Sequence, residues 1–106
     1  FEPCLILYPM VEFKKVFSKI SGLSEFNEES RQLQRNFFSS TATVELDTSG
    51  RFVIPKNMLT YAQLDKDIML VGMGNKVEVW NPTLYEKHLI NDQSELSKLA
   101  QKHLEQ

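Results

Sequence analysis

The residues with the clearest chemical potential form one short tract, Asp47-Thr48-Ser49-Gly50-Arg51. The guanidinium of an arginine is always charged and can make paired hydrogen bonds to phosphate or to O6 and N7 of guanine. Asp47 and Gly50 favour a turn, because aspartate can bond the backbone that follows it and glycine adopts a positive φ without steric cost. The tract therefore predicts a tight turn that presents Arg51, with DNA as a candidate ligand.

The neighbours of this arginine can add contacts that hold DNA without reading its sequence. Thr48, Ser49 and the backbone of Gly50 are candidates for contacts to phosphate. Lys56, which comes shortly after the turn, is a further candidate for a contact to the DNA backbone. These residues and Arg51 make up the predicted DNA-binding site.

Asp47 needs a different role, because its charge repels phosphate. We assign it to capping the turn and holding Arg51. An ordinary exposed salt bridge between these two residues, worth about 0–1 kcal/mol, is the alternative that the pattern leaves open. The segment from residue 43 to residue 60 carries two acidic and two basic side chains. One copy should therefore bind DNA weakly, and function would depend on several copies engaging together.

The elements around the turn must position it. Apolar residues alternate over residues 43–46 and run together over 52–54, which predicts two short strands on either side of the turn. Pro55 is typical of the first turn of a helix, because its φ is fixed near the helical value and it lacks a donor. We expect that helix to cover Lys56 to Leu64.

The rest of the chain reads as alternating short strands and helices. Apolar spacing and cap residues predict strands at 5–8, 68–71 and 77–80 and helices at 10–20, from 27, at 81–90 and again beyond a break at 91–94. Gly74-Asn75 predicts the hairpin turn between the last two strands. The fold class is therefore α+β.

A self-comparison places Leu5 to Lys15 on Val77 to Lys87. Both segments read as a strand, an aromatic residue, a proline-marked helix start and an aromatic residue further into the helix. The second copy has an upstream half, from Thr43 to Gly74, that the first lacks, and the chain begins without Met. We expect the sequence to be a fragment cut inside the first of two repeats.

Composition fits one domain that carries no secretory or membrane signal. The chain has 106 residues, of which 42% are hydrophobic, with a net charge of −2 and a single cysteine. It contains no apolar run near the roughly 20 residues that span a bilayer. The first residues do not resemble a signal peptide. These features predict a cytoplasmic domain, with any basic patch for nucleic acid being local.

Candidate sites for other chemistry are weak. His88 and His103 would lie about 22 Å apart along one straight helix, too far for a shared metal. Cys4 precedes an apolar strand, where a packed thiol is expected. Gly72-Met73-Gly74 lies between strands and does not open a helix, as a nucleotide-binding loop would. We predict no catalytic residue, metal, cofactor or small-molecule substrate, and no enzyme.

Several blocks in order resemble a known family. The strand, D-x-x-G-R tract, strand, Pro55 and short helix look like a swapped-hairpin repeat of the AbrB type. The further resemblance is to the MraZ family, which carries two such repeats joined by helices. The matching blocks are 46–51 for the second D-x-x-G-R motif, 69–72 and 75–80 for the closing hairpin, 3–9 for the end of the first repeat and 31–38 for the linking helix. The first repeat's own D-x-x-G-R motif is absent from this sequence.

The resemblance implies a fold and a domain layout. The fold would be an AbrB-like swapped-hairpin β-barrel, a small mixed β-sheet flanked by helices and duplicated about a pseudo-twofold axis. Residues 1–12 would end a truncated first repeat, and 13–41 would form linking helices. Residues 42–85 would form the second repeat, and 86–106 the C-terminal helices.

The resemblance also implies a function. Members of the family are bacterial repressors of their own cell-division and cell-wall gene cluster. They bind double-stranded DNA at promoter direct repeats as ring-like homo-oligomers, in the cytoplasm and associated with the nucleoid. Two alternatives stay open: an oligomerisation module without DNA affinity of its own, and an AbrB-like antitoxin whose C-terminal helix, with Leu96, Leu99 and Leu104, holds a partner protein.

Overall fold

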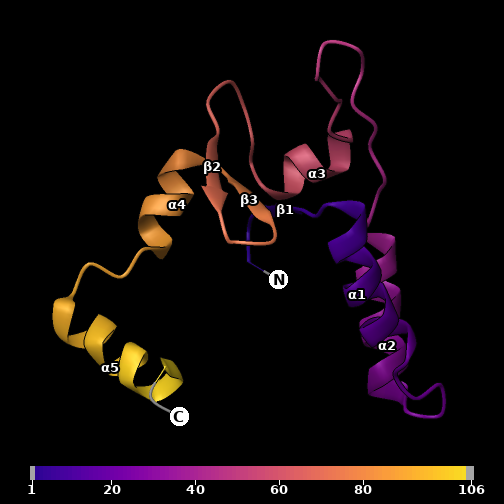
Figure 1. Cartoon of the computed structure of the whole chain (residues 1–106), viewed down its shortest axis with the longest axis horizontal. Coiled ribbons are helices and arrows are strands. Elements are labelled where there is room, and N and C mark those ends of the chain that lie inside the picture. Colours follow the sequence, from indigo (N-terminus) through magenta and orange to yellow (C-terminus); the bar gives the residue numbers. More distant parts are fainter. Residues whose placement is uncertain (1, 105–106) are drawn as a thin grey trace.

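A computed structural model describes residues 2–104 and shows an α+β chain built around a small sheet (Figure 1). Its elements are β1 (Leu5–Leu7), α1 (Met10–Ser21), α2 (Glu28–Ser39), α3 (Lys56–Tyr61), β2 (Met69–Gly72), β3 (Val77–Trp80), α4 (Pro82–His88) and α5 (Gln93–Leu104). The predicted fold class, a small sheet flanked by helices, is confirmed and is consistent with an AbrB-like fold.

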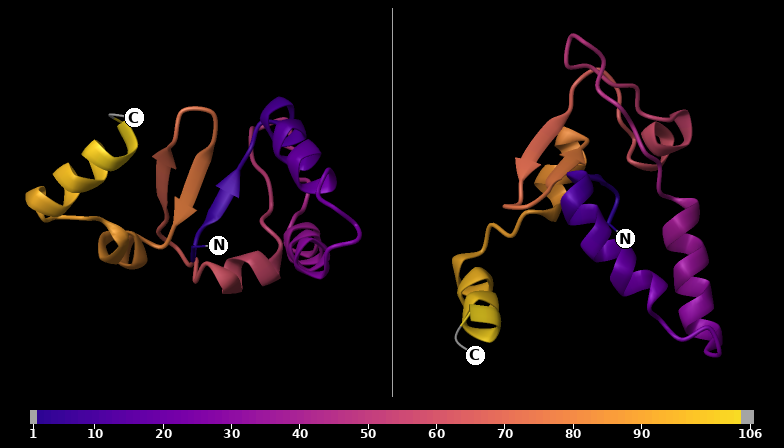
Figure 2. Two further views of the ribbon diagram at one scale, coloured as in Figure 1. Left: turned by 90° about the horizontal axis from the view of Figure 1, so that it is seen from below. Right: turned by 45° about the vertical axis from the view of Figure 1, so that its right-hand side comes forward.

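The sheet is open and antiparallel, with strand order β1-β3-β2 (Figure 2). β2 and β3 form the predicted hairpin, in which the Met73 amide donates to the Lys76 carbonyl at 2.8 Å and Gly74 adopts a φ of +84°. β1, from the N-terminal end of the chain, pairs with the other edge of β3. The central strand therefore comes from the C-terminal half of the chain.

The two strands that the self-comparison aligns lie side by side. That comparison places Ile6 on Glu78, and in the sheet these residues are opposite each other. Antiparallel pairing of equivalent residues creates a local twofold axis. After each strand an aromatic pair closes the turn into the helix, with ring centroids 5.9 Å apart for Tyr8 and Phe13 and 5.8 Å apart for Trp80 and Tyr85. This arrangement is the one expected of a duplicated strand–helix unit; the duplication and the domain boundaries at residues 12, 41 and 85 stay predictions.

Local capping explains where the helices begin. The Asn27 side chain accepts a hydrogen bond from the Ser30 amide, as expected for a helix cap. The Asn81 side chain accepts from the amides of Thr83 and Leu84, and Pro82 takes the first helical position. The predicted helix starts at Asn27 and Asn81 are therefore confirmed.

The predicted strands on either side of the Asp47–Arg51 turn are wrong for this chain: residues 41–55 form an arm that contains a turn but no strand (Figure 1). The arm projects away from the sheet, so its two sides have no third strand or apolar layer to pack on. A two-stranded ribbon is marginally stable without such support. The helix that follows also ends early, at Tyr61, and Gln63 adopts a φ of +53° shortly after it.

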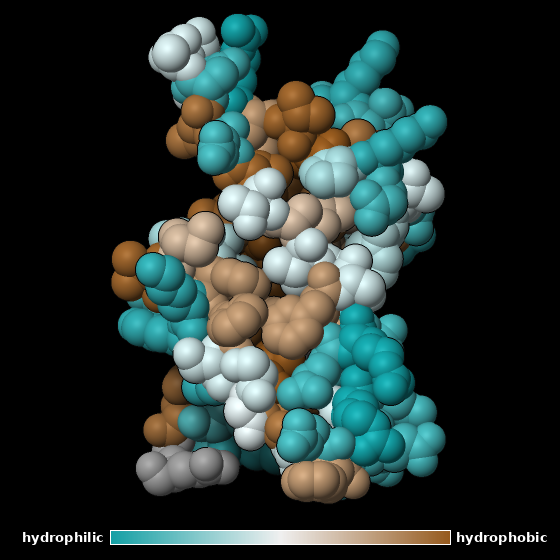
Figure 3. Space-filling view, turned by 90° about the vertical axis from the view of Figure 1, so that its right-hand side faces the viewer, coloured by the Kyte–Doolittle hydropathy of each residue, from teal (hydrophilic) through white to brown (hydrophobic). Residues whose placement is uncertain are grey.

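The buried core is small for the length of the chain. Among residues 2–104, the buried apolar side chains are those of Cys4, Ala62, Val79 and Trp80. The radius of gyration is 16.5 Å, against about 13 Å for a compact domain of this length. Hydrophobic surface lies between hydrophilic patches on the face shown in Figure 3. The chain therefore presents apolar surface that residues 2–104 do not cover.

An aromatic cluster joins α1 to α2. The rings of Phe13 and Phe37 stack with centroids 6.1 Å apart, and those of Phe17 and Phe38 lie 5.5 Å apart. The hairpin turn of the sheet contacts the same helix pair, because the Asn75 side chain donates to Glu12 at 3.2 Å. These contacts hold the α1–α2 pair on the side of the molecule opposite α4 and α5 (Figure 1).

Candidate nucleic-acid interface

The turn at the tip of the arm is organised by one carboxylate. Asp47 Oδ1 accepts hydrogen bonds from the backbone amides of Ser49, at 2.9 Å, and Arg51, at 2.8 Å. The Asp47 amide donates to the Arg51 carbonyl at 2.7 Å, and the Gly50 amide donates to the Asp47 carbonyl at 3.0 Å. Gly50 has a φ of +78°, which glycine adopts most readily. Asp47 therefore caps the turn as its residue type suggested.

The arginine of the turn keeps its charge accessible. Arg51 Nε lies 3.5 Å from the second carboxylate oxygen of Asp47, and the Arg51 side chain is 79% exposed. At this distance and exposure the ion pair contributes little, within about 0–1 kcal/mol. The exposed salt bridge between Asp47 and Arg51 is thus present, but it leaves the guanidinium accessible to a phosphate or a base edge.

The other residues of the tip are exposed, and the turn already uses some of their backbone groups. Within the part of the chain that the structure describes, the hydroxyls of Thr48 and Ser49 make no hydrogen bond. Both are therefore available to phosphate oxygens. The amides of Ser49 and Gly50 are engaged by Asp47, so a phosphate would have to compete with the turn for them.

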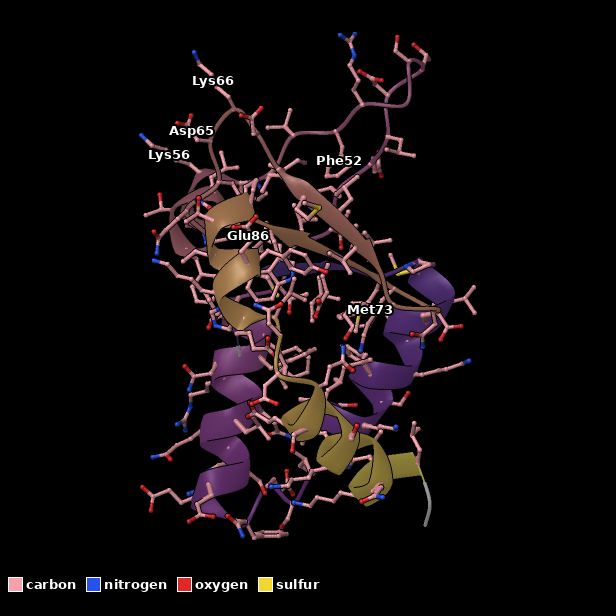
Figure 4. The ribbon with its side chains drawn as sticks, turned by 90° about the vertical axis from the view of Figure 1, so that its left-hand side faces the viewer. Phe52, Lys56, Asp65, Lys66, Met73 and Glu86 are labelled. Carbon is pink, nitrogen blue, oxygen red and sulfur yellow. The ribbon has the colours of Figure 1, made fainter. Side chains whose placement is uncertain are left out.

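The structure does not bring Lys56 to the tip. This residue starts α3, at the base of the arm, and Figure 4 shows its side chain well away from the end of the arm. Lys56 and Arg51 could touch the same duplex only at separate places along it. The candidate DNA-binding residues therefore fall into a tip group, residues 48–51, and one residue at the base.

Sequence reasoning missed how openly the arm displays apolar side chains. Val44, Leu46 and Val53 are 37%, 67% and 85% exposed. Val44 and Leu46 alternate with polar residues and Val53 lies in the apolar run 52–54, a pattern that predicts strands in a sheet; in this chain Val44 and Val53 instead line a hollow beside Asp47 and Arg51. The signal was present, although one sequence cannot say which surface covers such residues.

The remaining candidates have structural explanations. Cys4 is buried, and burial, followed by the nearby charges of Glu78 and Glu2, raises the pKa of its thiol to about 11. His88 Nδ1 lies 2.8 Å from the Leu84 carbonyl oxygen in the same helix. Residues 2–104 contain no group of three side chains placed to hold a metal ion. No helix within that range combines the length and the apolar character needed to cross a bilayer.

Comparison with known proteins gives consistent matches. The family described as "MraZ protein, putative antitoxin-like" matches residues 37–106. The protein named "Transcriptional regulator MraZ" from Cytophaga hutchinsonii is 58% identical over 104 residues, which cover 98% of this chain and 69% of that protein. Proteins of the same name from Pseudomonas savastanoi and Christiangramia forsetii are 45% and 36% identical over 76% and 95% of the chain. The chain spans 53% and 65% of their respective lengths.

Proposed function

Because the chain belongs to the MraZ family, whose curated relatives are named transcriptional regulators, we propose that it is a sequence-specific DNA-binding repressor. It acts without enzymatic chemistry, by occupying a promoter. Its DNA contact is the turn at Asp47–Arg51. The observation that carries the proposal is an exposed arginine on a hydrogen-bonded turn at the end of a projecting arm.

The arm suits DNA for geometric and electrostatic reasons. A turn that projects from the body can enter a groove, and a guanidinium can bond guanine or phosphate with two parallel donors. The hydroxyls of Thr48 and Ser49 would set the position of the arm on the phosphates, and Lys56 would add a contact further along the duplex. Hydrogen bonds to Asp47 hold the arm tip in shape before it binds.

Several arms in one oligomer would compensate for the low DNA affinity of a single arm. A single arm carries one arginine at its tip and no net charge over residues 43–60, so its affinity should be low. A ring-like homo-oligomer bound to direct repeats would engage several arms at once and multiply their effect. The extended shape and the exposed apolar residues of the single chain support assembly. Its target would be the promoter of a bacterial cell-division and cell-wall gene cluster, in the cytoplasm and associated with the nucleoid.

Fluorescence anisotropy on a labelled duplex with G-rich direct repeats tests the proposal. We expect binding that weakens steeply between low and physiological salt, because phosphate contacts release counterions. Arg51→Ala should abolish it. The matched control is Lys14→Ala, which removes one exposed positive charge from α1, on another part of the chain. Equal loss in both variants, or no binding by the parent chain at low salt, would refute the assignment of the arm and favour a pure assembly module.

A further inference from the structure

Val53 is an open apolar side chain close to the arginine of the arm. It follows Arg51 by two residues and is 85% exposed. It belongs to the arm, which projects from the sheet (Figure 1). Two methyl groups are therefore open to solvent next to the candidate DNA contact.

Val53 lies on the same side of the arm as Arg51. The Asp47 amide donates to the Arg51 carbonyl at 2.7 Å, which sets these two residues opposite each other where the legs of the arm meet the turn. Side chains of an extended chain alternate between its two sides, so Glu45 follows Asp47 and Val53 follows Arg51 on one side. All four residues line the same hollow. We call this side of the arm, with residues 45, 47, 51 and 53, the Arg51 side.

Val53 departs from the pattern of the Arg51 side, where the other three residues are charged. By the same alternation the opposite side of the arm carries only apolar residues, namely Val44, Leu46, Phe52 and Ile54. The other apolar residues that line the hollow are less exposed: Val44 is 37% exposed, and Phe52 and Pro55 are half-buried. The apolar side suits packing, which leaves Val53 as an open apolar group among charged residues.

The Arg51 side suits base edges better than phosphates. Glu45 adds a carboxylate that would repel phosphate, whereas the exposed guanidinium of Arg51 can bond O6 and N7 of guanine in the major groove. In that groove the C5-methyl group of thymine is the apolar group that identifies a base. Burying this methyl group against those of a valine is favourable, because apolar surface on both sides leaves water. An exposed valine beside such an arginine is therefore matched to thymine.

We propose that Val53 contacts the methyl group of a thymine near the guanine that Arg51 reads. The inference rests on the proposed DNA binding and adds a second, apolar determinant of its sequence specificity. Residues two positions apart in an extended chain lie about 7 Å apart, and successive bases rise by about 3.4 Å. The thymine would therefore lie within about two base pairs of the guanine.

Exchanging thymine for deoxyuridine tests this contact, because deoxyuridine keeps the hydrogen-bonding groups of thymine and lacks only its methyl group. Two labelled duplexes of the same sequence hold G-rich direct repeats with A·T pairs on both sides of the guanines. One duplex carries thymine and the other deoxyuridine. Fluorescence anisotropy at low salt gives the ratio of their affinities for the 106-residue chain. We expect the thymine duplex to bind about threefold to fivefold tighter for each arm engaged, the difference made by one buried methyl group.

Val53→Ala should bring this affinity ratio close to one, because it removes the two methyl groups that meet the thymine. A general change in the arm would weaken binding to both duplexes equally and leave the ratio as it is. The matched control is Val11→Ala, which makes the same substitution at a residue of α1 that is 70% exposed and should keep the ratio of the parent. Far-UV circular dichroism checks that both variants keep their helices.

Three outcomes would overturn the inference, and they separate it from the proposed function. A ratio of one for the parent chain, while Arg51→Ala still abolishes binding, overturns the thymine contact and leaves DNA binding by the arm in place. A ratio that Val53→Ala does not change shows that the methyl group acts elsewhere, for instance through the shape of the duplex. No binding of the parent chain to either duplex overturns the proposed DNA binding and the thymine contact together.

Discussion

Two substitutions at Asp47 separate what the carboxylate does for the backbone from what it does for the arginine. One oxygen accepts two backbone hydrogen bonds, from Ser49 and Arg51, and the other lies 3.5 Å from the Arg51 side chain. Asp47→Asn keeps an acceptor for both amides and removes the ion pair. Asp47→Ala removes both.

The magnitudes differ because the two interactions differ. A net contribution of about 0.5–1.5 kcal/mol for each hydrogen bond puts the loss for two exposed bonds at about 1–2 kcal/mol of turn stability. If the shaped turn is the binding-competent state, Asp47→Ala should weaken each arm about 5- to 30-fold for DNA. Asp47→Asn should bind at least as tightly as the parent chain, because it also removes a negative charge beside the phosphates.

Fluorescence anisotropy on the direct-repeat duplex measures the DNA affinity of both variants, and Lys14→Ala is the control for changing one exposed charge outside the arm. Circular dichroism should show unchanged helix content, since the arm contains no regular element. If Asp47→Asn and Asp47→Ala weaken binding equally, the ion pair and not the backbone cap positions the arginine, and the reasoning above fails.

Two other predictions follow from the body of the molecule. Asn81→Ala removes the cap of α4 and the hydrogen bond from Asn81 Nδ2 to the Gln63 carbonyl. The free energy of unfolding in denaturant should therefore fall by about 0.5–2 kcal/mol. An unchanged unfolding midpoint would show that Pro82 alone starts the helix. The pKa of the Cys4 thiol is about 11 in the folded chain, against an ordinary 9.0. Between these values the unfolded chain loses the thiol proton and the folded chain keeps it, so the free energy of unfolding should decline as the pH rises from about 9 to about 11. Cys4→Ser should remove that decline, and labelling of the parent thiol near pH 8 should require unfolding; rapid labelling of the native chain would contradict the burial.

The sequence predicts correctly those caps and turns that depend on hydrogen bonds between near neighbours. Asn27 and Asn81 cap helices through amides two or three residues ahead, so their roles follow from short spacing. The Gly74 turn and the Asp47 cap are equally local. The DNA-binding role of the turn rests on family membership and on the exposed arginine, and it awaits the binding measurement.

The sequence predicts less well the features that depend on contacts between distant residues. Residues 43–46 and 52–54 have the composition of strands, but a strand forms only where another strand accepts its hydrogen bonds, and the sequence does not state which one is in reach. The separation of Lys56 from the arm tip was hidden for the same reason, because it depends on the direction in which the arm leaves α3. The placement of α5 at the opposite end of the molecule from α1 and α2 likewise cannot be predicted from residue spacing.

By itself the sequence determined the start of most helices, the turn of the hairpin, the capped turn that carries Arg51 and the family of the chain. These depend on hydrogen bonds between near neighbours and on residue types with narrow backbone preferences. Only the tertiary structure decided that β1 pairs with β3 about a local twofold axis, that the arm projects from the sheet and that α5 lies at the opposite end of the molecule from α1 and α2. Such features depend on which distant surfaces bury each other, and burial is a property of the whole chain and not of any segment.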